Sequence, residues 1–254
     1  MKSMLSQLKE TNQPLYLFGW LNIIFWIICL FGIAVSDMEI LGINAWIKPS
    51  KFFISAAIYS WTMLWYIRYL PTKKANKAFS WMIILVFTFE NFYILWRASK
   101  GELSHFNITS ATTIVLFSLM GVAISILTAW TAFIGFQFCY YKLPELPRSY
   151  HWGIRIGILS FVFFAFSGFI MAGYLQHTVG AADGGAGIPY LNWSKQHGDL
   201  RIAHFLGMHA LQLFPLLGYY ILKKTSYLLP LMAVYIAANF YVLLMALEGK
   251  SLFW

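Results

Sequence analysis

The stretch Ser194-Lys-Gln-His197-Gly-Asp199-Leu-Arg201-Ile-Ala-His204-Phe-Leu-Gly-Met-His209-Ala-Leu-Gln212 passes from a polar loop into an apolar segment. Three of the chain's six histidines fall in it, together with an aspartate and an arginine. A helix that carries His204 and His209 into lipid bears polar groups that are costly there, and such groups are candidates for function. The stretch therefore predicts a membrane helix with a functional site near one end.

The composition agrees with a membrane protein. The chain has 254 residues, of which 60% are hydrophobic and only 11% are charged, whereas a soluble domain carries about 25% charged residues. A net charge of +9 would suggest nucleic acid as the partner of a soluble protein, but membrane topology accounts for it here, so we expect no nucleic acid partner. The two cysteines, Cys29 and Cys139, form no CxxC motif and so give no thiol-redox or zinc-ribbon signature.

Seven apolar segments are each long enough to cross a bilayer. We expect helices at about 15–35, 51–70, 79–96, 109–141, 152–175, 201–222 and 227–247, with an outer loop at 176–200. No separate soluble domain fits into the remaining connections. The sequence therefore predicts an all-α, polytopic integral membrane protein with seven transmembrane helices in a single transmembrane domain over 1–254.

The basic residues predict the orientation. Of the 18 lysines and arginines, eleven, Lys2 among them, fall on the side of the N-terminus, and seven fall on the opposite side. Because basic residues are enriched in cytoplasmic connections, we expect a cytoplasmic N-terminus and an outer C-terminus in a bacterial-type inner (plasma) membrane.

With this orientation, most polar residues of the spans fall in the outer leaflet, so we expect a site facing the extracytoplasmic side between the second, third, fourth and sixth helices. Its candidate catalytic carboxylates are Glu90 and Asp199. Its candidate haem or metal ligands are three histidines, His105, His204 and His209. A cationic rim that could hold carboxylates, phosphates or haem propionates comprises Lys48, Lys51, Arg97 and Arg201.

Each candidate also has a structural interpretation. His204 and His209 are five residues apart, about 140° round a helix, so they are not the i,i+4 metal pair of a zincin, and His209 could simply bond a neighbouring helix. Ser104 or Asn107 could cap a helix beside His105. Glu90 must be protonated or paired with a cation from another helix. The lysines could be interfacial anchors.

Four functions remain open, and whether the protein is an enzyme stays undecided. A b-type haem-binding membrane redox protein is the leading hypothesis, because the chain is 19% aromatic and carries the cationic rim. The first alternative is an intramembrane metal-dependent hydrolase using zinc, or iron, on the three histidines. The second is a transporter or receptor for a small anionic or aromatic ligand, and the third is a structural factor. Besides the lipid bilayer, a quinone or a small anionic ligand is a possible partner.

Overall fold

A computed structural model describes residues 4–253, so Lys2 of the orientation argument lies outside the described residues. The fold is nearly all-α and 71% helical, as the sequence predicts. The chain divides into two compact units, Met1–Leu127 and Thr128–Trp254, here called the N-terminal and C-terminal units. Helix α5 (Ala111–Tyr140) supplies its first part to one and its second part to the other.

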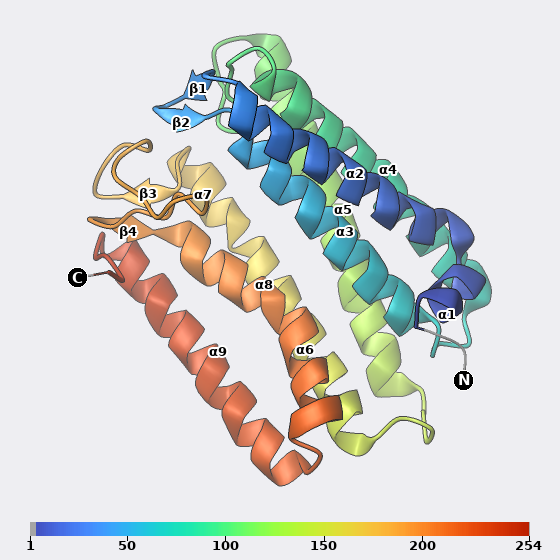
Figure 1. Cartoon of the computed structure of the whole chain (residues 1–254). Coiled ribbons are helices and arrows are strands. Elements are labelled where there is room, and N and C mark those ends of the chain that lie inside the picture. The colour runs from blue at the N-terminus through green and yellow to red at the C-terminus, as the bar shows by residue number, and fades with distance from the viewer. Residues whose placement is uncertain (1–3, 254) are drawn as a thin grey trace. The chain divides into compact units, whose positions relative to one another are not determined.

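The N-terminal unit is built from long helices joined by short connections. It contains α1 (Met4–Thr11), α2 (Gln13–Val35), α3 (Ile47–Ile67), α4 (Lys73–Ala98) and the beginning of α5. A small hairpin of β1 (Glu39–Ile40) and β2 (Ile43–Asn44) connects α2 to α3. Figure 1 shows α2 and α3 running side by side, with α4 next to them. Lys48, at the start of α3, and Arg97, at the end of α4, therefore belong to the same unit.

Small residues let α2 approach α3 closely. A side chain at Gly19 would collide with the Trp61 indole, and one at Gly32 would collide with the ring of Trp46. The indole nitrogen Nε1 of Trp61 donates to the carbonyl of Tyr16 across the same contact, at 3.2 Å. Tight packing and interhelical hydrogen bonds are what hold helices together in lipid, where the hydrophobic effect between them is weak.

The C-terminal unit contains the second part of α5, then α6 (Arg148–Phe166), α7 (Gly168–Tyr174), α8 (Leu200–Leu216) and α9 (Thr225–Leu247). Strand β3 (Thr178–Val179) pairs antiparallel with β4 (Gly198–Asp199). Helix α8 continues as a π-helical turn η1 (Leu217–Ile221), two residues beyond Pro215. In Figure 1 the helices α6, α8 and α9 lie together, and β3 and β4 lie at one end of them.

The α6–α8 contact is the tightest in this unit. A side chain at Gly157 would meet the carbonyl oxygen of Ala210 at 2.7 Å, and one at Gly207 would overlap the Phe164 ring. The hydroxyls of Ser149 and Ser160 donate across the contact to backbone carbonyls of the facing segment. The helices therefore touch backbone to backbone, with no room for a ligand between them.

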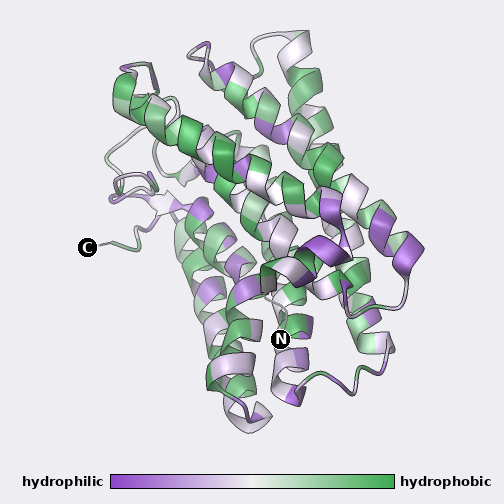
Figure 2. Cartoon of the chain, turned by 45° about the vertical axis from the view of Figure 1, so that its right-hand side comes forward, coloured by the Kyte–Doolittle hydropathy of each residue, from purple (hydrophilic) through white to green (hydrophobic). Residues whose placement is uncertain are grey.

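Within residues 4–253, six helices are long and apolar enough to cross a membrane, and these are Gln13–Val35, Lys73–Ala98, Ala111–Tyr140, Arg148–Tyr174, Leu200–Ile221 and Thr225–Leu247. Figure 2 shows hydrophobic residues along their lengths. The remaining predicted span, 51–70, corresponds to α3, which is long enough at 21 residues but too polar to join the six. Much of α3 is buried against α2 and α4, so its side chains need not be as apolar as those that face lipid.

Candidate functional site

Two polar atoms one helical turn apart on α4 are buried without a hydrogen-bond partner among residues 4–253. They are the carboxyl oxygen Oε1 of Glu90 and the phenol oxygen of Tyr93. Glu90 is 5% exposed and Tyr93 is 6% exposed. A buried polar group that makes no hydrogen bond destabilises the fold by about 1–3 kcal/mol, and native proteins contain few of them. The Glu90–Tyr93 pair is therefore the strongest candidate for a ligand-binding site in the N-terminal unit.

Apolar and aromatic side chains pack around Tyr93. Tyr93 packs with Ile94 of α4 and Met120 of α5, and Phe52 of α3, Phe89 and Leu116 pack against these three. The rings of Phe89 and Tyr93 are stacked at 6.5 Å between centroids. Lys48, at the start of α3, is a cation whose charge acts on Glu90.

His105 adjoins the same aromatic group through Phe52. It lies in the connection between α4 and α5, and its ring is 5.6 Å from that of Phe52 and 5.9 Å from that of Phe117. Its ring nitrogen Nδ1 is 3.1 Å from the hydroxyl of Ser104. The side-chain oxygen of Asn107 accepts from the backbone N–H of Thr109, two residues before α5 begins, so Asn107 does not cap that helix. The hydroxyl of Ser110 accepts from the backbone N–H of Thr113 instead. The structure thus places His105 beyond the C-terminal end of α4, among aromatic side chains.

Arg97 is engaged by an acid that the sequence interpretation left out. Its Nη1 lies 2.6 Å from the carboxylate of Glu102, and its Nε donates to the carbonyl of Leu103 at 3.3 Å. Arg97 therefore closes the loop that follows α4. The rim predicted from Lys48, Lys51, Arg97 and Arg201 is less cationic than the sequence suggests.

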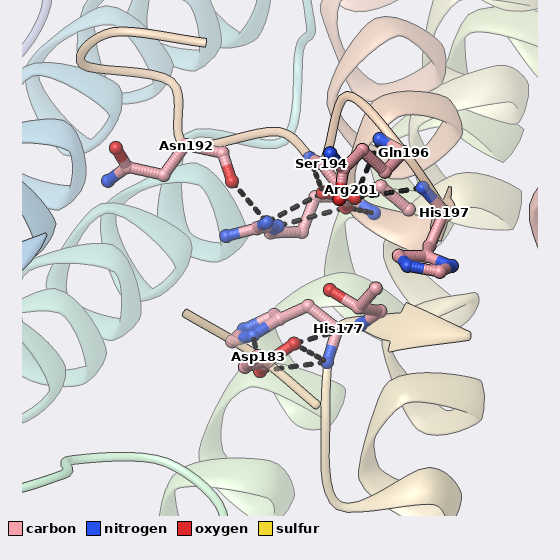
Figure 3. Close-up of polar contacts among 9 residues, drawn as sticks. His177, Asp183, Asn192, Ser194, Gln196, His197 and Arg201 are labelled. Atoms are coloured by element: carbon pink, nitrogen blue, oxygen red, sulfur yellow. Dashed lines mark hydrogen bonds and ion pairs between the residues drawn. The ribbon is translucent and has the colours of Figure 1, made fainter. Parts of the chain in front are cut away.

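Asp199 is the N-cap of α8 and is 1% exposed. Its carboxylate accepts from the backbone N–H of Arg201 at 3.0 Å and of Ser194 at 2.7 Å, and from Nε and Nη2 of Arg201 at 2.9 and 2.6 Å. Figure 3 shows Arg201 also reaching the backbone carbonyl of Asn192. These bonds account for the burial of Asp199 without any catalytic role, and they use the guanidinium that was expected to hold an anion.

A second carboxylate, Asp183, organises the other half of the 176–200 loop. It accepts from the backbone N–H groups of His177 and Thr178 and contacts Nδ1 of His177 at 2.6 Å (Figure 3). Burial alone would raise the pKa of Asp183, but the hydrogen bonds and charge of His177, together with Thr178, outweigh burial and hold that pKa well below its usual value. Strand β3 also pairs with β4, so the 176–200 loop is held by these bonds in a folded arrangement, here called the cap.

His204 crosslinks α8 to α6. Its Nδ1 lies 2.6 Å from the carbonyl oxygen of Phe164 and 3.3 Å from the hydroxyl of Ser167. A carbonyl oxygen only accepts, so Nδ1 carries the proton, and in a neutral imidazole the other nitrogen, Nε2, then presents a lone pair. Histidines that ligate metals are commonly oriented by such a bond. The same bond is also a sufficient structural reason for a histidine at this position.

His209 has different surroundings. Its ring lies 4.3 Å from that of Phe205, which in turn is 5.5 Å from the ring of Trp193 in the cap. The side chain of Gln212, one turn further on, bonds to His209. His209 therefore belongs to an aromatic row that runs from the cap onto α8, and it shares no contact with the Phe164 carbonyl that holds His204.

The predicted site residues thus fall in two groups. Within the N-terminal unit lie Lys48, Lys51, Glu90, Arg97 and His105; within the C-terminal unit lie Asp199, Arg201, His204 and His209. Between residues 4 and 253, no group of three or more His, Cys, Asp or Glu side chains has a geometry that could hold a metal ion. Each unit therefore has to be considered as a site in its own right.

Several polar residues were missed by sequence reasoning. Tyr93 is three positions from Glu90, and that helical spacing could have identified it. In the same unit, the amide of Asn91 donates to the side-chain oxygen of Asn22 at 2.9 Å, and both residues are buried. Asparagines are rare enough inside apolar spans to be a signal by themselves. Asp183 gave no such signal, because a single aspartate among glycines is typical of an ordinary turn.

Comparison with known proteins finds no family that matches this chain, and no curated protein or solved structure similar to it. The case for a function therefore rests on the arrangements described above.

Proposed function

We propose that this protein is a multi-pass membrane protein whose N-terminal unit binds a small aromatic molecule with hydrogen-bonding groups, as a receptor or a transporter does. The observation that carries the proposal is the pair of unpartnered buried atoms on Glu90 and Tyr93, one helical turn apart, with aromatic side chains packed around Tyr93. Ligand sites combine mostly apolar and aromatic linings with a few polar groups that fix orientation. This pair has that composition.

The topology belongs to the same proposal. Six helices meet the requirements of a span, and α3, packed between α2 and α4, would be the seventh. With seven crossings the two termini would lie on opposite sides of the membrane. The distribution of basic residues would then put the N-terminus in the cytoplasm and the C-terminus outside. Lys48, Arg97 and His105 would then lie at the outer face of the membrane, with Glu90 about 10 Å deeper than Arg97, because seven residues of helix rise about 10 Å.

An aromatic ligand is favoured over a small anion. Two arginines of the predicted rim are already paired with Glu102 and Asp199, which weakens the attraction for an anion. A ring of the quinone type, one of the partners that the sequence suggests, matches the aromatic lining better.

The test is to purify the protein in a mild detergent, extract it with organic solvent, and identify retained small molecules by mass spectrometry. We expect one class of aromatic molecule to be retained by the wild-type protein and lost from Tyr93→Phe. Ser60→Ala, which removes another buried unpartnered hydroxyl in the same unit, serves as the matched control and should retain it. Empty wild-type extracts, together with no thermal stabilisation by any aromatic compound in a screen, would contradict the proposal.

A b-type haem held by His204 is the second candidate, and the bond from Nδ1 to the Phe164 carbonyl is the observation that favours it. Because α6 and α8 touch backbone to backbone, a haem would have to approach from the Nε2 side. An absorption spectrum with metal analysis tests this. A Soret band that shifts on reduction, and is lost in His204→Ala but kept in His197→Ala, would support haem. Zinc or iron without a Soret band would instead favour the metal-dependent hydrolase.

A further inference from the structure

The connection between α3 and α4 gathers cations and contains no acid. Between Trp65 and Trp81 the chain has no aspartate or glutamate, and its basic residues are Arg68, Lys73, Lys74 and Lys77. The three lysines are exposed on the first two turns of α4. Thirteen positions separate Lys77 from Glu90, about 20 Å along a helix, so these cations are distinct from the ligand site proposed above.

The three lysines lie where helix electrostatics disfavours them. The first turn of a helix carries partial positive charge, which favours acids and disfavours cations, yet α4 has no acid in its first turn. Lys73 and Lys77 are four apart, a spacing at which like charges on a helix repel each other. Among residues 4–253, no acid forms an ion pair with any of the three lysines. A negatively charged group from outside the chain would therefore relieve this repulsion.

Arg68 adds a cation whose position is fixed. Its guanidinium carbon Cζ lies 4.1 Å from the ring centroid of Trp65 and 5.1 Å from that of Tyr69. Its Nη1 donates to Oε1 of Gln7 at 2.6 Å, and Figure 1 shows α1, which carries Gln7, beside this end of α3. The bond to Gln7 uses one of the five N–H donors of a guanidinium, whose planar shape suits the oxygens of a phosphate.

Asn76 holds the connection together. It is 7% exposed, and its side-chain amide donates to the carbonyl of Ile67 at 2.9 Å and to that of Leu70 at 3.3 Å. These bonds join the end of α3, next to Arg68, to the first turn of α4, which carries the lysines. The four cations are therefore held in one ordered turn, so less side-chain and backbone entropy is lost when they bind a ligand.

An apolar surface continues directly from the lysines. Lys73, Lys77, Trp81 and Leu85 follow one another at intervals of four along one face of α4, and Trp81 and Leu85 are 46% and 64% exposed. Because α4 is apolar enough to span a bilayer and tryptophans of spans are enriched at the headgroup level, Trp81 marks that level. Lys77 and Lys73 then lie about 6 and 12 Å beyond Trp81, toward water.

We propose that Arg68, Lys73, Lys74 and Lys77 form a binding surface for the headgroups of anionic phospholipids. Basic residues next to a span attract such lipids, and here a fixed guanidinium and an exposed tryptophan accompany them. A soluble anion would meet the same charges. Only a lipid would also cover the apolar row of Trp81 and Leu85 with its acyl chains, so the row favours a lipid over free phosphate.

The experiment titrates the purified full-length protein in mild detergent with two phospholipids that have identical acyl chains, anionic phosphatidylglycerol and uncharged phosphatidylcholine. Dissociation constants are obtained from the thermal stabilisation at increasing ratios of lipid to detergent. We expect the wild type to bind phosphatidylglycerol about tenfold or more tightly, because each basic residue near a lipid surface contributes a factor of about five. This preference should shrink between about 0.1 M and about 1 M salt, since the Debye length falls from about 10 to about 3 Å.

Two sets of variants locate the surface. The triple variant Lys73→Gln, Lys74→Gln, Lys77→Gln should lose most of the preference, and arginine at the same three positions should retain it. The matched control, Lys142→Gln, Lys223→Gln, Lys224→Gln, removes three exposed lysines of the C-terminal unit and should also retain it. All of these positions are exposed, and glutamine and arginine resemble lysine in helix propensity, so folding should be unaffected.

Several results would overturn the proposal. Equal binding of the two lipids to the wild type, or equal losses in the two glutamine triple variants, would show that this surface does not select anionic lipids. Inorganic phosphate that stabilises the wild type as much as phosphatidylglycerol does would identify a soluble anion as the ligand. If the glutamine variant of α4 fails to fold, the wild type and the arginine variant still decide, because a preference that salt does not weaken, or that arginine abolishes, contradicts a charged headgroup site.

Discussion

The guanidinium of Arg201 folds back onto the carboxylate of Asp199, two residues earlier, and meets both of its oxygens at 2.9 and 2.6 Å. The same carboxylate caps α8. One buried pair therefore closes the cap, starts the helix, and neutralises a cation that the sequence assigns to ligand binding. Because Asp199 is buried and its charge is paired and hydrogen-bonded, removing one partner of the pair leaves an uncompensated charge and is strongly destabilising.

Asp199→Ala should destabilise the C-terminal unit by about 3–5 kcal/mol, since it leaves the Arg201 charge partly buried and unpaired and removes the cap of α8. Arg201→Leu should cost less, because Asp199 keeps the backbone N–H groups of Arg201 and Ser194. Thermal denaturation followed by circular dichroism measures both. Equal losses of stability in the two variants would mean that the Asp199–Arg201 ion pair, rather than the N-cap of α8, carries the stability.

Asp183→Asn should weaken the cap in a pH-dependent way. The pKa of Asp183 is lowered in the folded protein, so its stabilising contribution is fully present above its unfolded pKa of about 3.9 and is lost as the pH falls through the lower folded pKa. The wild type should therefore be more resistant to proteolysis of the 176–200 loop at about pH 7, and the difference from Asp183→Asn should shrink below about pH 4. Asp37→Asn, at an exposed position, is the control and should show no difference at any pH. A difference that grows on acidification would contradict the prediction.

Gly157→Ala should disrupt the α6–α8 contact. The added methyl group would lie 2.7 Å from the carbonyl oxygen of Ala210, a backbone atom that can move only if the helices separate. Overpacking of this kind costs about 1–3 kcal/mol. Gly173→Ala is the matched control, because nothing lies within 4 Å of its added atom, and alanine is the better helix former by up to about 1 kcal/mol. The order of melting temperatures should thus be Gly173→Ala at or above wild type, with Gly157→Ala several degrees below.

The Asn22–Asn91 hydrogen bond should couple α2 to α4. Asn22→Leu or Asn91→Leu alone leaves one buried amide unsatisfied and should cost about 1–3 kcal/mol. The double variant should be nearer to wild type, giving a coupling of about 0.6–2 kcal/mol, in the range measured for polar pairs between membrane helices. Measuring the free energy of unfolding of the two single variants and the double variant completes this double-mutant cycle. Additive losses would show that the two amides act independently.

The sequence by itself determined the fold class. Runs of some twenty apolar residues with so few charges can bury their backbone polar groups in lipid only as helices, and helices occupy all seven expected ranges. The sequence also singled out Glu90, because an acid amid apolar neighbours is conspicuous whatever the tertiary structure.

Only the tertiary structure decided what those polar residues contact. Asp199 and Arg201 are close in sequence, yet nothing in their spacing shows whether the arginine turns back to the aspartate or outward to a ligand. His204 meets a carbonyl 40 residues away, and Asn91 meets an amide 69 residues away. Hydrogen bonds depend on distances and angles of fractions of an ångström, which helix packing sets and a hydropathy pattern does not contain. For that reason the sequence located the polar groups, whereas packing determined which of them are satisfied and left Glu90 and Tyr93 without partners.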